Sequence, residues 1–499
     1  MRMSKRWKKA LPAAALLAVC LLLFTATAFA EKSGGESGKT YYVSSSTGND
    51  ENDGLSEATA WKSLDKISEL TLGAGDEVLL KRGDRWVGEL LRLYSPAGTQ
   101  EAPAQLGAYG EGEKPKIAKY EDSVPKHDFK EPLIRIENAE HFVVDGLDIG
   151  FCGVGMDLHY EKVTNREDVH VQNCHFHDIY GFFQGDTLEY PHAVGIVVTA
   201  YVPIPGCTDP VIRGLYIDGC TSYDAGALYT YGARWGSIGD NVADLIVTNC
   251  VMRNNGEYGI AVCNMTGGYM DNCKIIDCGS RYAPMGSMGV MIKANGFTIM
   301  NCEIAYQQRL EDNPDGGGID FEHMGYDIDI INCYIHDNSG VGIMLYSSGS
   351  DASHQNKRVR IIGNVFENNN RNVYKPGGAE ILALPLYSLV DGSIYNNRYM
   401  ESDNLFTMNM DQSVTVAGNF SYTEEKQGQM WPIYDFDDVR AYVLDGVPLP
   451  DLEKELTDAG RTVSVFNYVT GACIGLAAVA VLYVVTAIVT AKKRKKVAA

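Results

Sequence analysis

The feature that most constrains the fold is a short phrase, apolar residues followed by Asn-Cys or Gly-Cys, that recurs along the chain. Successive copies lie 23 to 46 residues apart, and two later copies, at 361–364 and 393–397, continue the pattern without cysteine. The copies with cysteine end at Cys174, Cys220, Cys250, Cys273, Cys302 and Cys333. A repeat of this length that holds several short elements is typical of a solenoid, in which each repeat packs against its neighbours.

A second segment of each repeat opens with glycine and then alternates between its two faces. The glycines are Gly195, Gly259, Gly289, Gly318 and Gly342. Alternation with a period of two predicts β-strands, and residues 31–464 show no long helical period. We therefore expect an all-β fold, a right-handed parallel β-helix, in which equivalent residues of successive coils stack about 4.8 Å apart. The Asn and Cys positions then form columns along the coil.

The chain contains 12 cysteines, which are interpreted through this repeat. Cys20 and Cys473 lie in terminal apolar segments, and six of the other ten occupy one column. A stack of small buried thiols accounts for that column, so we predict no metal site. In an exported protein the spacing suggests a disulfide only for Cys273 with Cys278, or for Cys263 with a neighbour.

Both ends of the chain carry basic residues beside an apolar run. Residues 1–30 have a positive start, an apolar stretch and a small-x-small site before Glu31, which is typical of a signal peptide. Residues 465–491 lack charged side chains and are long enough to span a bilayer as one C-terminal helix. The basic tail, 492–499, is expected to stay in the cytoplasm. We therefore predict an exported domain that is anchored in the cell membrane.

The charge of the chain divides along the same boundaries. The formal net charge is −21, but both terminal segments are purely basic, so residues 31–464 carry 33 basic against 64 acidic side chains, or −31. Such a domain is a poor partner for nucleic acid and for other polyanions. We divide it into an N-terminal cap with the first coils (31–135), the β-helix repeats (136–400), and a coil closure with a stalk (401–464).

The segment ahead of the repeats carries a resemblance to a known superfamily. The motifs at 41–44, 61–64 (Trp-Lys-Ser-Leu), 75–80 (Gly-Asp-Glu-Val-Leu-Leu) and 109–115 look like the entry segment of pectate-lyase-like β-helix proteins. The resemblance implies that this segment forms the first coils and a helix, here from Ser63 to Leu70, that caps the open end of the core. It specifies a fold and not an activity, because the superfamily holds lyases, hydrolases and non-catalytic surface proteins.

Candidate catalytic residues are expected on the outward side of the glycine-started strands, because one sheet of such a coil usually floors a groove. Aligned on their glycines, these strands give two outward columns that are mostly apolar or neutral. The first reads Val197, Leu228, Ala261, Met291, Asp320, Met344 and Glu380, and the second reads Thr199, Thr230, Cys263, Lys293, Glu322, Tyr346 and Leu382. Asp320 and Glu322 therefore face outward together, with Lys293 one coil away.

Two carboxylates on one face make a candidate site for cleavage of a glycosidic bond. Their Cα atoms would lie roughly 6.5–7 Å apart. Hydrolysis needs a protonated carboxyl and an ionised one, about 5–5.5 Å apart when configuration is retained and wider when it is inverted. Asp320 interrupts an apolar column, which favours a function. Glu322 is either catalytic or a salt-bridge partner of Lys293, and Glu380 is too many coils away to act with Asp320.

Asp327 is a third acid in the same repeat. The residue five positions before the Asn of each phrase reads Asp168, Gly214, Asp244, Gly267, Gly296, Asp327 and Arg358. Asp and Gly are common in turns because they tolerate turn conformations. The column alone therefore makes Asp327 a turn residue more readily than a catalyst.

The segment from Gly317 to Glu322, followed by Asp327, carries a narrower resemblance. It looks like the active-site region of family 136 of the glycoside hydrolases, the β-helix lacto-N-biosidases of gut bacteria, whose two aspartates are seven residues apart. The resemblance implies that Asp320 and Asp327 are the catalytic pair of a retaining mechanism that releases a disaccharide, with Asp320 as acid/base. It also implies a helical helper domain, which this chain would obtain from a separately encoded protein.

Substrate contacts are expected from residues near this strand. Lys293 and Tyr346 share its outward column, and His323 is expected to donate hydrogen bonds at the groove edge rather than to bind metal. Aromatic side chains suit stacking on sugar rings, which makes Tyr231 and Trp235 candidates, although such residues also pack long loops.

Two other functions compete with a hydrolase. A polysaccharide lyase would use Lys293 as base and Ca²⁺ held by acidic side chains, whereas a hydrolase would need no cofactor. A non-catalytic surface protein would bind a glycan without turnover. The acidic domain and the scarcity of outward basic residues favour a neutral oligosaccharide as partner, and therefore a hydrolase.

Overall fold

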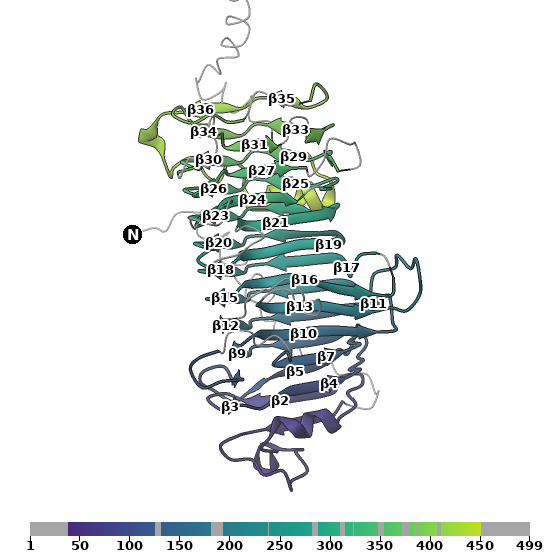
Figure 1. Ribbon diagram of the computed structural model, residues 1–499. Coiled ribbons are helices and arrows are strands. Elements are labelled where there is room, and N and C mark those ends of the chain that lie inside the picture. The colour runs from purple at the N-terminus through teal and green to yellow at the C-terminus, as the bar shows by residue number, and fades with distance from the viewer. Residues whose placement is uncertain are drawn as a thin grey trace, which may run out of the picture. The chain divides into compact units, whose positions relative to one another are not determined.

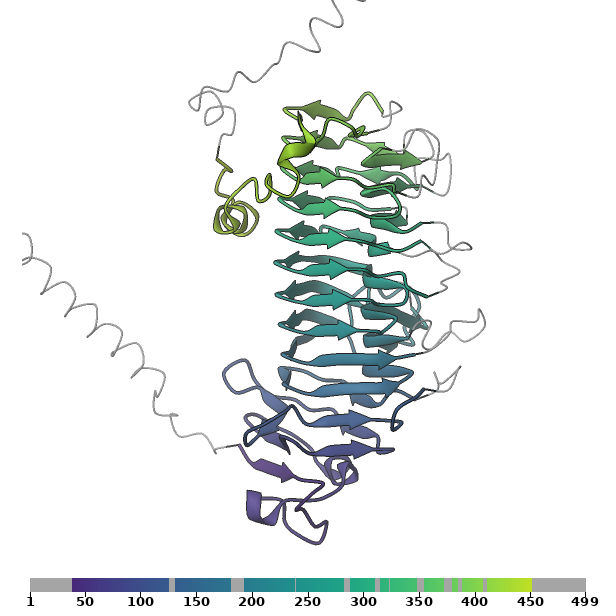
Figure 2. The same cartoon turned by 90° about the vertical axis from the view of Figure 1, so that its left-hand side faces the viewer.

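The computed structural model describes residues 38–124, 131–180, 193–237, 239–281, 288–309, 315–322, 324–347, 354–371, 379–384, 388–406 and 411–450. Residues up to Phe436 belong to one compact unit, and residues from Asp437 onward belong to a second unit. In the first unit the described strands wind into a stack of coils whose strands pair in parallel (Figure 1, Figure 2). The prediction of an all-β parallel β-helix is confirmed.

Each coil contributes strands to three faces. The first face is built from β4 (Leu91–Tyr94), β7 (Ile134–Glu137), β10 (Val154–Glu161), β13 (Val194–Tyr201), β16 (Ala227–Trp235), β19 (Tyr258–Asp271), β21 (Met288–Asn295), β24 (Gly317–Glu322), β27 (Ile343–Tyr346) and β31 (Ile381–Leu384). This face carries Asp320.

The second face follows around the coil. It contains β1 (Thr40–Val43), β2 (Glu77–Lys81), β5 (Ala104–Tyr109), β8 (Phe142–Asp145), β11 (Arg166–Gln172), β14 (Ile212–Asp218), β17 (Val242–Thr248), the end of β19, β22 (Thr298–Met300), β25 (Asp329–Ile331), β29 (Arg360–Ile362), β33 (Ser393–Tyr395) and β35 (Thr415–Ala417). Two short strands, β28 (Asn356–Lys357) and β32 (Leu389–Val390), pair with each other beside it.

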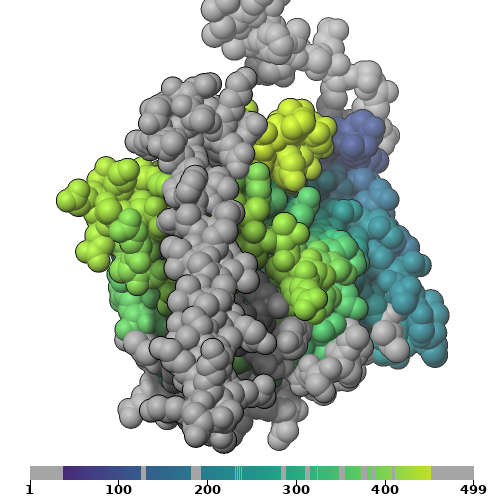
Figure 3. Space-filling model, turned by 90° about the horizontal axis from the view of Figure 1, so that it is seen from above, coloured from purple at the N-terminus to yellow at the C-terminus, as the bar shows by residue number. Residues whose placement is uncertain are grey.

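The third face forms a separate parallel sheet. Its strands are β3 (Arg85–Val87), β6 (Lys116–Ala118), β9 (Asp148–Cys152), β12 (His175–Ile179), β15 (Thr221–Tyr223), β18 (Val251–Arg253), β20 (Lys274–Ile276), β23 (Glu303–Ala305), β26 (Tyr334–His336), β30 (Val365–Glu367), β34 (Arg398–Met400) and β36 (Phe420–Tyr422). The inward residues of the three faces meet in one apolar core that extends from Val43 to Leu405. Figure 3 views the stack from its C-terminal end, where the last coils appear in green.

The cysteine column is a ladder of buried thiols. The ten cysteines among the described residues form no disulfide, and six of them end the repeated phrase. The Sγ of Cys250 donates to the carbonyl of Ile217 in the coil before, and the Sγ of Cys302 accepts from the amide N–H of Cys273. The thiols thus occupy small core positions while they satisfy backbone groups at the turn.

Asparagine replaces cysteine in the same column toward the C-terminus. The side chain of Asn364 accepts from the N–H of Cys333 at 2.8 Å and donates to the carbonyl of Ile330 at 2.8 Å. Asn397 repeats this pattern one coil later, accepting from the N–H of Asn364 and donating to the carbonyl of Ile361. An amide makes both bonds with stronger donors and acceptors than a thiol does.

The residue before each Cys or Asn of this column has a backbone conformation that explains why the repeated phrase carries Asn at that position. Asn173, Asn249, Asn301 and Asn332 all have φ between 51° and 55°, and Gly219 and Gly363 stand at equivalent positions with φ of 59° and 61°. Asparagine and glycine tolerate this left-handed conformation better than other residues. The repeated phrase therefore encodes a tight corner between the second and third faces.

The helix predicted from Ser63 to Leu70 is present as a short 3₁₀ helix, η3 (Leu64–Glu69), which buries Leu64 and Ile67 in the core. Other helical turns are η2 (Glu57–Thr59), η4 (Glu424–Lys426), α2 (Phe436–Arg440) and η5 (Ala441–Asp445). In the second unit, Arg440 forms an ion pair with Asp437 at 2.9 Å. No helix within residues 38–450 that the structure describes is long and apolar enough to cross a membrane. The predicted signal peptide, 1–30, and membrane span, 465–491, lie outside the described residues.

The segment after the last strand returns along the corner that the Asn residues form. The indole of Trp431 donates to the carbonyl of Asn332 at 2.7 Å, and the N–H groups of Ile433 and Tyr434 donate to the side-chain oxygen of Asn332. This segment therefore lies against the outside of the turns, where it forms hydrogen bonds with Asn332.

We expect Asn364→Ala to lower the free energy of unfolding by about 2–4 kcal/mol, because it leaves the N–H of Cys333 and the carbonyl of Ile330 buried without partners. Cys302→Ala removes weaker thiol contacts and should cost less. Urea unfolding followed by circular dichroism measures both variants. An equal or smaller loss in Asn364→Ala would contradict the role given to the amide ladder.

Candidate active site

Strand β24 carries the two predicted carboxylates on its outer side. Ile319 and Phe321 point into the core, so Asp320 and Glu322 point the other way. Gly318 precedes them at a place where a Cβ would lie 2.6 Å from the carbonyl of Gly342, so the coils can approach closely only because this residue is glycine. The side chain of Asp320 is fully buried and that of Glu322 is half-buried.

The register of the strands corrects the predicted columns at two places. Val197 pairs with Thr230 and Met344 pairs with Leu382, where the alignment had placed Leu228 and Glu380. Gly195 and Gly342 instead lie against the carbonyls of Leu228 and Glu380. In those two coils a larger residue occupies the position that glycine holds in the other coils. An alignment of the strands on their glycines therefore places these two strands two residues out of register.

The corrected column around Asp320 is apolar on both sides. Asp320 pairs with Met291 in the coil before and with Met344 in the coil after. Val197, Ala261 and Met291 belong to a buried apolar cluster on this outer side, separate from the main core. Asp320 thus lies in a buried, largely apolar row on the first face, which holds a second acidic residue, Asp157, nearer the N-terminus.

Glu322 lies in the neighbouring row, with Lys293 and Tyr346 on either side. Glu322 pairs with Tyr346, and the pairing of Ile292 with Phe321 places Lys293 beside Glu322. Burial raises the pKa of Glu322 above its usual value, and the charge of Lys293 opposes this shift only in part. The structure therefore brings together three predicted residues, Lys293, Glu322 and Tyr346, next to Asp320.

Asp327 lies on the corner that follows β24. Its φ is 54°, and Asp168, Asp244, Arg358 and Asp391 share this left-handed conformation at equivalent corners, as the turn argument expected. The guanidinium of Arg358 contacts both carboxylate oxygens of Asp327, at 2.5 and 2.6 Å. These hydrogen bonds lower the pKa of Asp327 below its usual value.

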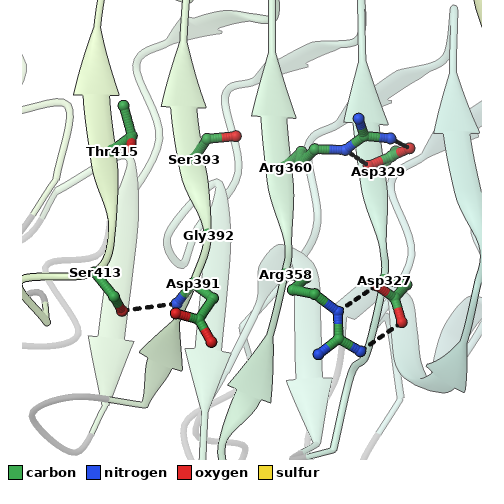
Figure 4. A pocket seen from close by; sticks show the side chains of 9 residues that line it. All are labelled: Asp327, Asp329, Arg358, Arg360, Asp391, Gly392, Ser393, Ser413 and Thr415. Atoms are coloured by element: carbon green, nitrogen blue, oxygen red, sulfur yellow. Dashed lines mark hydrogen bonds and ion pairs between the residues drawn. The ribbon is translucent and has the colours of Figure 1, made fainter.

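Asp327 also borders a polar hollow of about 560 Å³ (Figure 4). Two rows of side chains line it, one along the corner and one along the second face, where Asp329 is paired with Arg360. The lining residues are Asp327, Asp329, Arg358, Arg360, Asp391, Gly392, Ser393, Ser413 and Thr415. Asp327 thus faces the surface of the second face, whereas Asp320 belongs to the outer side of the first.

Of the other residues predicted to contact substrate, two lie on a strand that is farther from Asp320, and one lies outside the described residues. Tyr231 and Trp235 are part of β16, where they pair with Val198 and Tyr201, and β19 and β21 separate this strand from β24. The described atoms do not include their side chains, and His323 lies outside the described residues. Glu380 is buried and accepts hydrogen bonds from the side chain and N–H of Asn369, so it ends a ladder of amides.

A second group of polar side chains lies on the first face and was not predicted from the sequence. Asp157 is fully buried, accepts a hydrogen bond from Thr199 at 2.7 Å and lies 4.0 Å from the Nε of Arg135. His159 shares the Thr199 hydroxyl at 2.8 Å, and burial lowers the pKa of His159 to about 4. The pattern Gly155-Met-Asp157-Leu-His159 matches Gly318-Ile-Asp320-Phe-Glu322, so the glycine-started alternation could have found it.

Comparison with known proteins agrees with this architecture. A family model described as "Right handed beta helix region" matches residues 204–423. The class that the coils define is therefore the right-handed parallel β-helix.

Within that class, the predicted resemblance to lacto-N-biosidase is confirmed. A lacto-N-biosidase of Bifidobacterium longum subsp. longum is 40% identical over an alignment of 128 residues, and the match covers 23% of this chain and only 8% of that protein. The crystal structure of the GH136 lacto-N-biosidase from Eubacterium ramulus is similar in fold, with a TM-score of 0.55 and 18% identity. That match covers 77% of this chain and 68% of the other.

We expect Glu322→Gln to raise the thermal midpoint of unfolding at pH 7. The raised pKa of Glu322 means that folding disfavours its charged form, so this penalty is present above the usual pKa and absent below it. The gain should therefore vanish near pH 4. Differential scanning calorimetry at both pH values makes the comparison, and a lower midpoint at pH 7 would assign Glu322 to a stabilising ion pair with Lys293 instead.

Proposed function

We propose that the chain is a glycoside hydrolase that cleaves neutral oligosaccharides in the manner of a lacto-N-biosidase, with release of a disaccharide. The observation that carries this proposal is the pair of carboxylates on the outer side of β24. The similarity to lacto-N-biosidases supports the same reaction class. Burial of Asp320 beside apolar neighbours is the environment in which a carboxyl group is kept available as an acid.

We assign Asp320 the acid/base role and consider two partners for it. Glu322 shares the strand and its outer side, which gives the shorter path between the carboxyl groups. Asp327 matches the spacing of seven residues in the resembled family, and its lowered pKa keeps it ionised, as a nucleophile must be. To act with Asp320, the Asp327 carboxylate would have to leave the guanidinium of Arg358 and contact the substrate instead. We propose a retaining mechanism.

A neutral substrate fits the charges around β24. Lys293 is the basic side chain beside the two carboxylates in the coil before, and burial raises the pKa of Glu322. Residues 31–464 carry an excess of acidic side chains, which would repel a polyuronate. Lys293 and Tyr346 are proposed to contact the sugar that occupies this part of the face.

The setting of the enzyme is proposed from the sequence. A signal peptide and a C-terminal membrane helix would place the β-helix at the surface of a bacterial cell, with the basic tail inside. A separately encoded helper protein would act with this chain, and no cofactor would be required.

We expect Asp320→Asn to reduce the rate of glycan cleavage by about 10²–10⁴-fold, because the general acid is lost. The second carboxylate is identified by comparing Glu322→Gln with Asp327→Asn, of which one should show a similar loss. Asp244→Asn is the matched control, since Asp244 is an exposed corner residue with the same conformation as Asp327. Full activity in both Asp320→Asn and Asp327→Asn would disprove the hydrolase assignment as stated.

The reaction class is tested on a panel of neutral glycans, with and without a co-expressed neighbouring protein. We expect a released disaccharide whose initial anomeric configuration, observed by NMR, equals that of the substrate. An unsaturated product that absorbs in the ultraviolet and disappears with a Ca²⁺ chelator would instead show a lyase with Lys293 as base. Binding without any product would show a glycan-binding surface protein.

A further inference from the structure

The third face carries a cluster of metal-ligating side chains that the proposed hydrolase does not use. Asp148 comes from β9, and His175 and His177 come from the next strand of that face, β12 (Figure 1). One ligand atom from each lies within 4.8 Å of the others. We propose that these residues, here named the Asp148 site, bind a divalent transition-metal ion of the Zn²⁺ class.

The ligand atoms converge because of the strand register. His175 pairs directly with Asp148 across the two strands, and His177, two residues on, points to the same side. His175 Nδ1 lies 3.3 Å from one carboxylate oxygen of Asp148, and His177 Nε2 lies 2.7 Å from the other. Tetrahedral ligands at zinc distances lie about 3.3 Å apart. The His175–Asp148 contact already has this length, and the His177–Asp148 contact would need to open by about 0.6 Å.

A glycine makes room for this arrangement. Gly150 pairs with His177, and a Cβ at residue 150 would lie 2.7 Å from both Cε1 and Nε2 of the imidazole. Any other residue would push the ring away from Asp148. The ring of Phe151, the next residue, lies nearly perpendicular to the His177 ring, with centroids 5.4 Å apart. The third face is thus shaped to hold this imidazole over the Asp148 carboxylate.

Asp178 supplies the hydrogen-bond partner that a metal-binding histidine usually has on the ring nitrogen that does not bind the metal. Its carboxylate lies 2.6 Å from Nδ1 of His177, the nitrogen that does not face Asp148. Such a carboxylate fixes the tautomer and orientation of the ring, so that Nε2 is presented to the metal. His177 is buried, whereas His175 and Asp148 are partly exposed, which leaves solvent access for an entering ion and for a water ligand.

The same face contains a related cluster that lacks one ligand. His336 contacts Asp337 at 2.9 Å through Nδ1 and Glu303 at 3.6 Å through Nε2, as His177 contacts Asp178 and Asp148. The position equivalent to His175, two residues before His336, is Tyr334, which stacks on the His336 ring as His175 stacks on the His177 ring but offers no imidazole nitrogen. Two imidazoles and a carboxylate favour zinc over calcium or magnesium, and of these two clusters on the third face the Asp148 site is the one that has both imidazoles. The chain therefore contains its own matched control.

Isothermal titration of the full-length chain with ZnCl₂, after removal of bound metal with EDTA, tests the proposal. We expect one high-affinity site, with at least 100-fold weaker binding in His175→Ala and 10–100-fold weaker binding in Asp178→Asn. His336→Ala should bind as the unmodified chain does. His175 is partly exposed, so its replacement should leave the fold intact, which the circular dichroism spectrum checks.

A thermal melt gives a second readout. ZnCl₂ should raise the unfolding midpoint of the unmodified chain and of His336→Ala but not of His175→Ala, and CaCl₂ at the same concentration should have no effect. Absence of zinc binding, or binding that His175→Ala leaves unchanged, would overturn the proposal. Loss of binding in His141→Ala alone would also overturn it, because His141 contacts Asp168 on another corner of the coil. None of these measurements depends on glycosidase activity.

Discussion

The hydrogen bonds at the corner between the second and third faces determine the rest of the structure. Thiols in the early coils and amides in the later ones bond to backbone groups of the adjacent coil, so each coil is fixed on the one before it. A β-strand that slips by one residue turns every side chain to the opposite side. These ladders therefore decide which residues reach the core and which face outward.

Fixed register has a direct consequence for chemistry. A residue on the outer side of one strand meets the residues paired with it in the coils before and after, and distant parts of the chain meet only through that stacking. Asp320 is consequently surrounded by Met291 and Met344, and Glu322 by Lys293 and Tyr346. The same rule brings His175 and His177 to Asp148 on the third face, where the intervening sequence gives no sign of their proximity.

The sequence predicts the repeats, the buried thiols and the outward direction of Asp320, because each follows from a local period or from a repeated phrase. It fails where a coil departs from its neighbours. Leu228 and Glu380 occupy positions that glycine holds elsewhere, so the alignment slipped there. The Asp148 site was not predicted because its ligands belong to different coils, and only the register of β9 with β12 brings them together.

Spacing along the chain has a different meaning in a coil than in a single strand or helix. Asp320 and Asp327 are seven residues apart, but a corner lies between them, so their side chains start on different faces and Asp327 is held by Arg358. Asp320 and Glu322 start on the same side of one strand. If Asp327 is the partner, substrate must draw its carboxylate away from the guanidinium, and that step would make Arg358 part of the energetics of binding. If Glu322 is the partner, Arg358 has no role in the reaction.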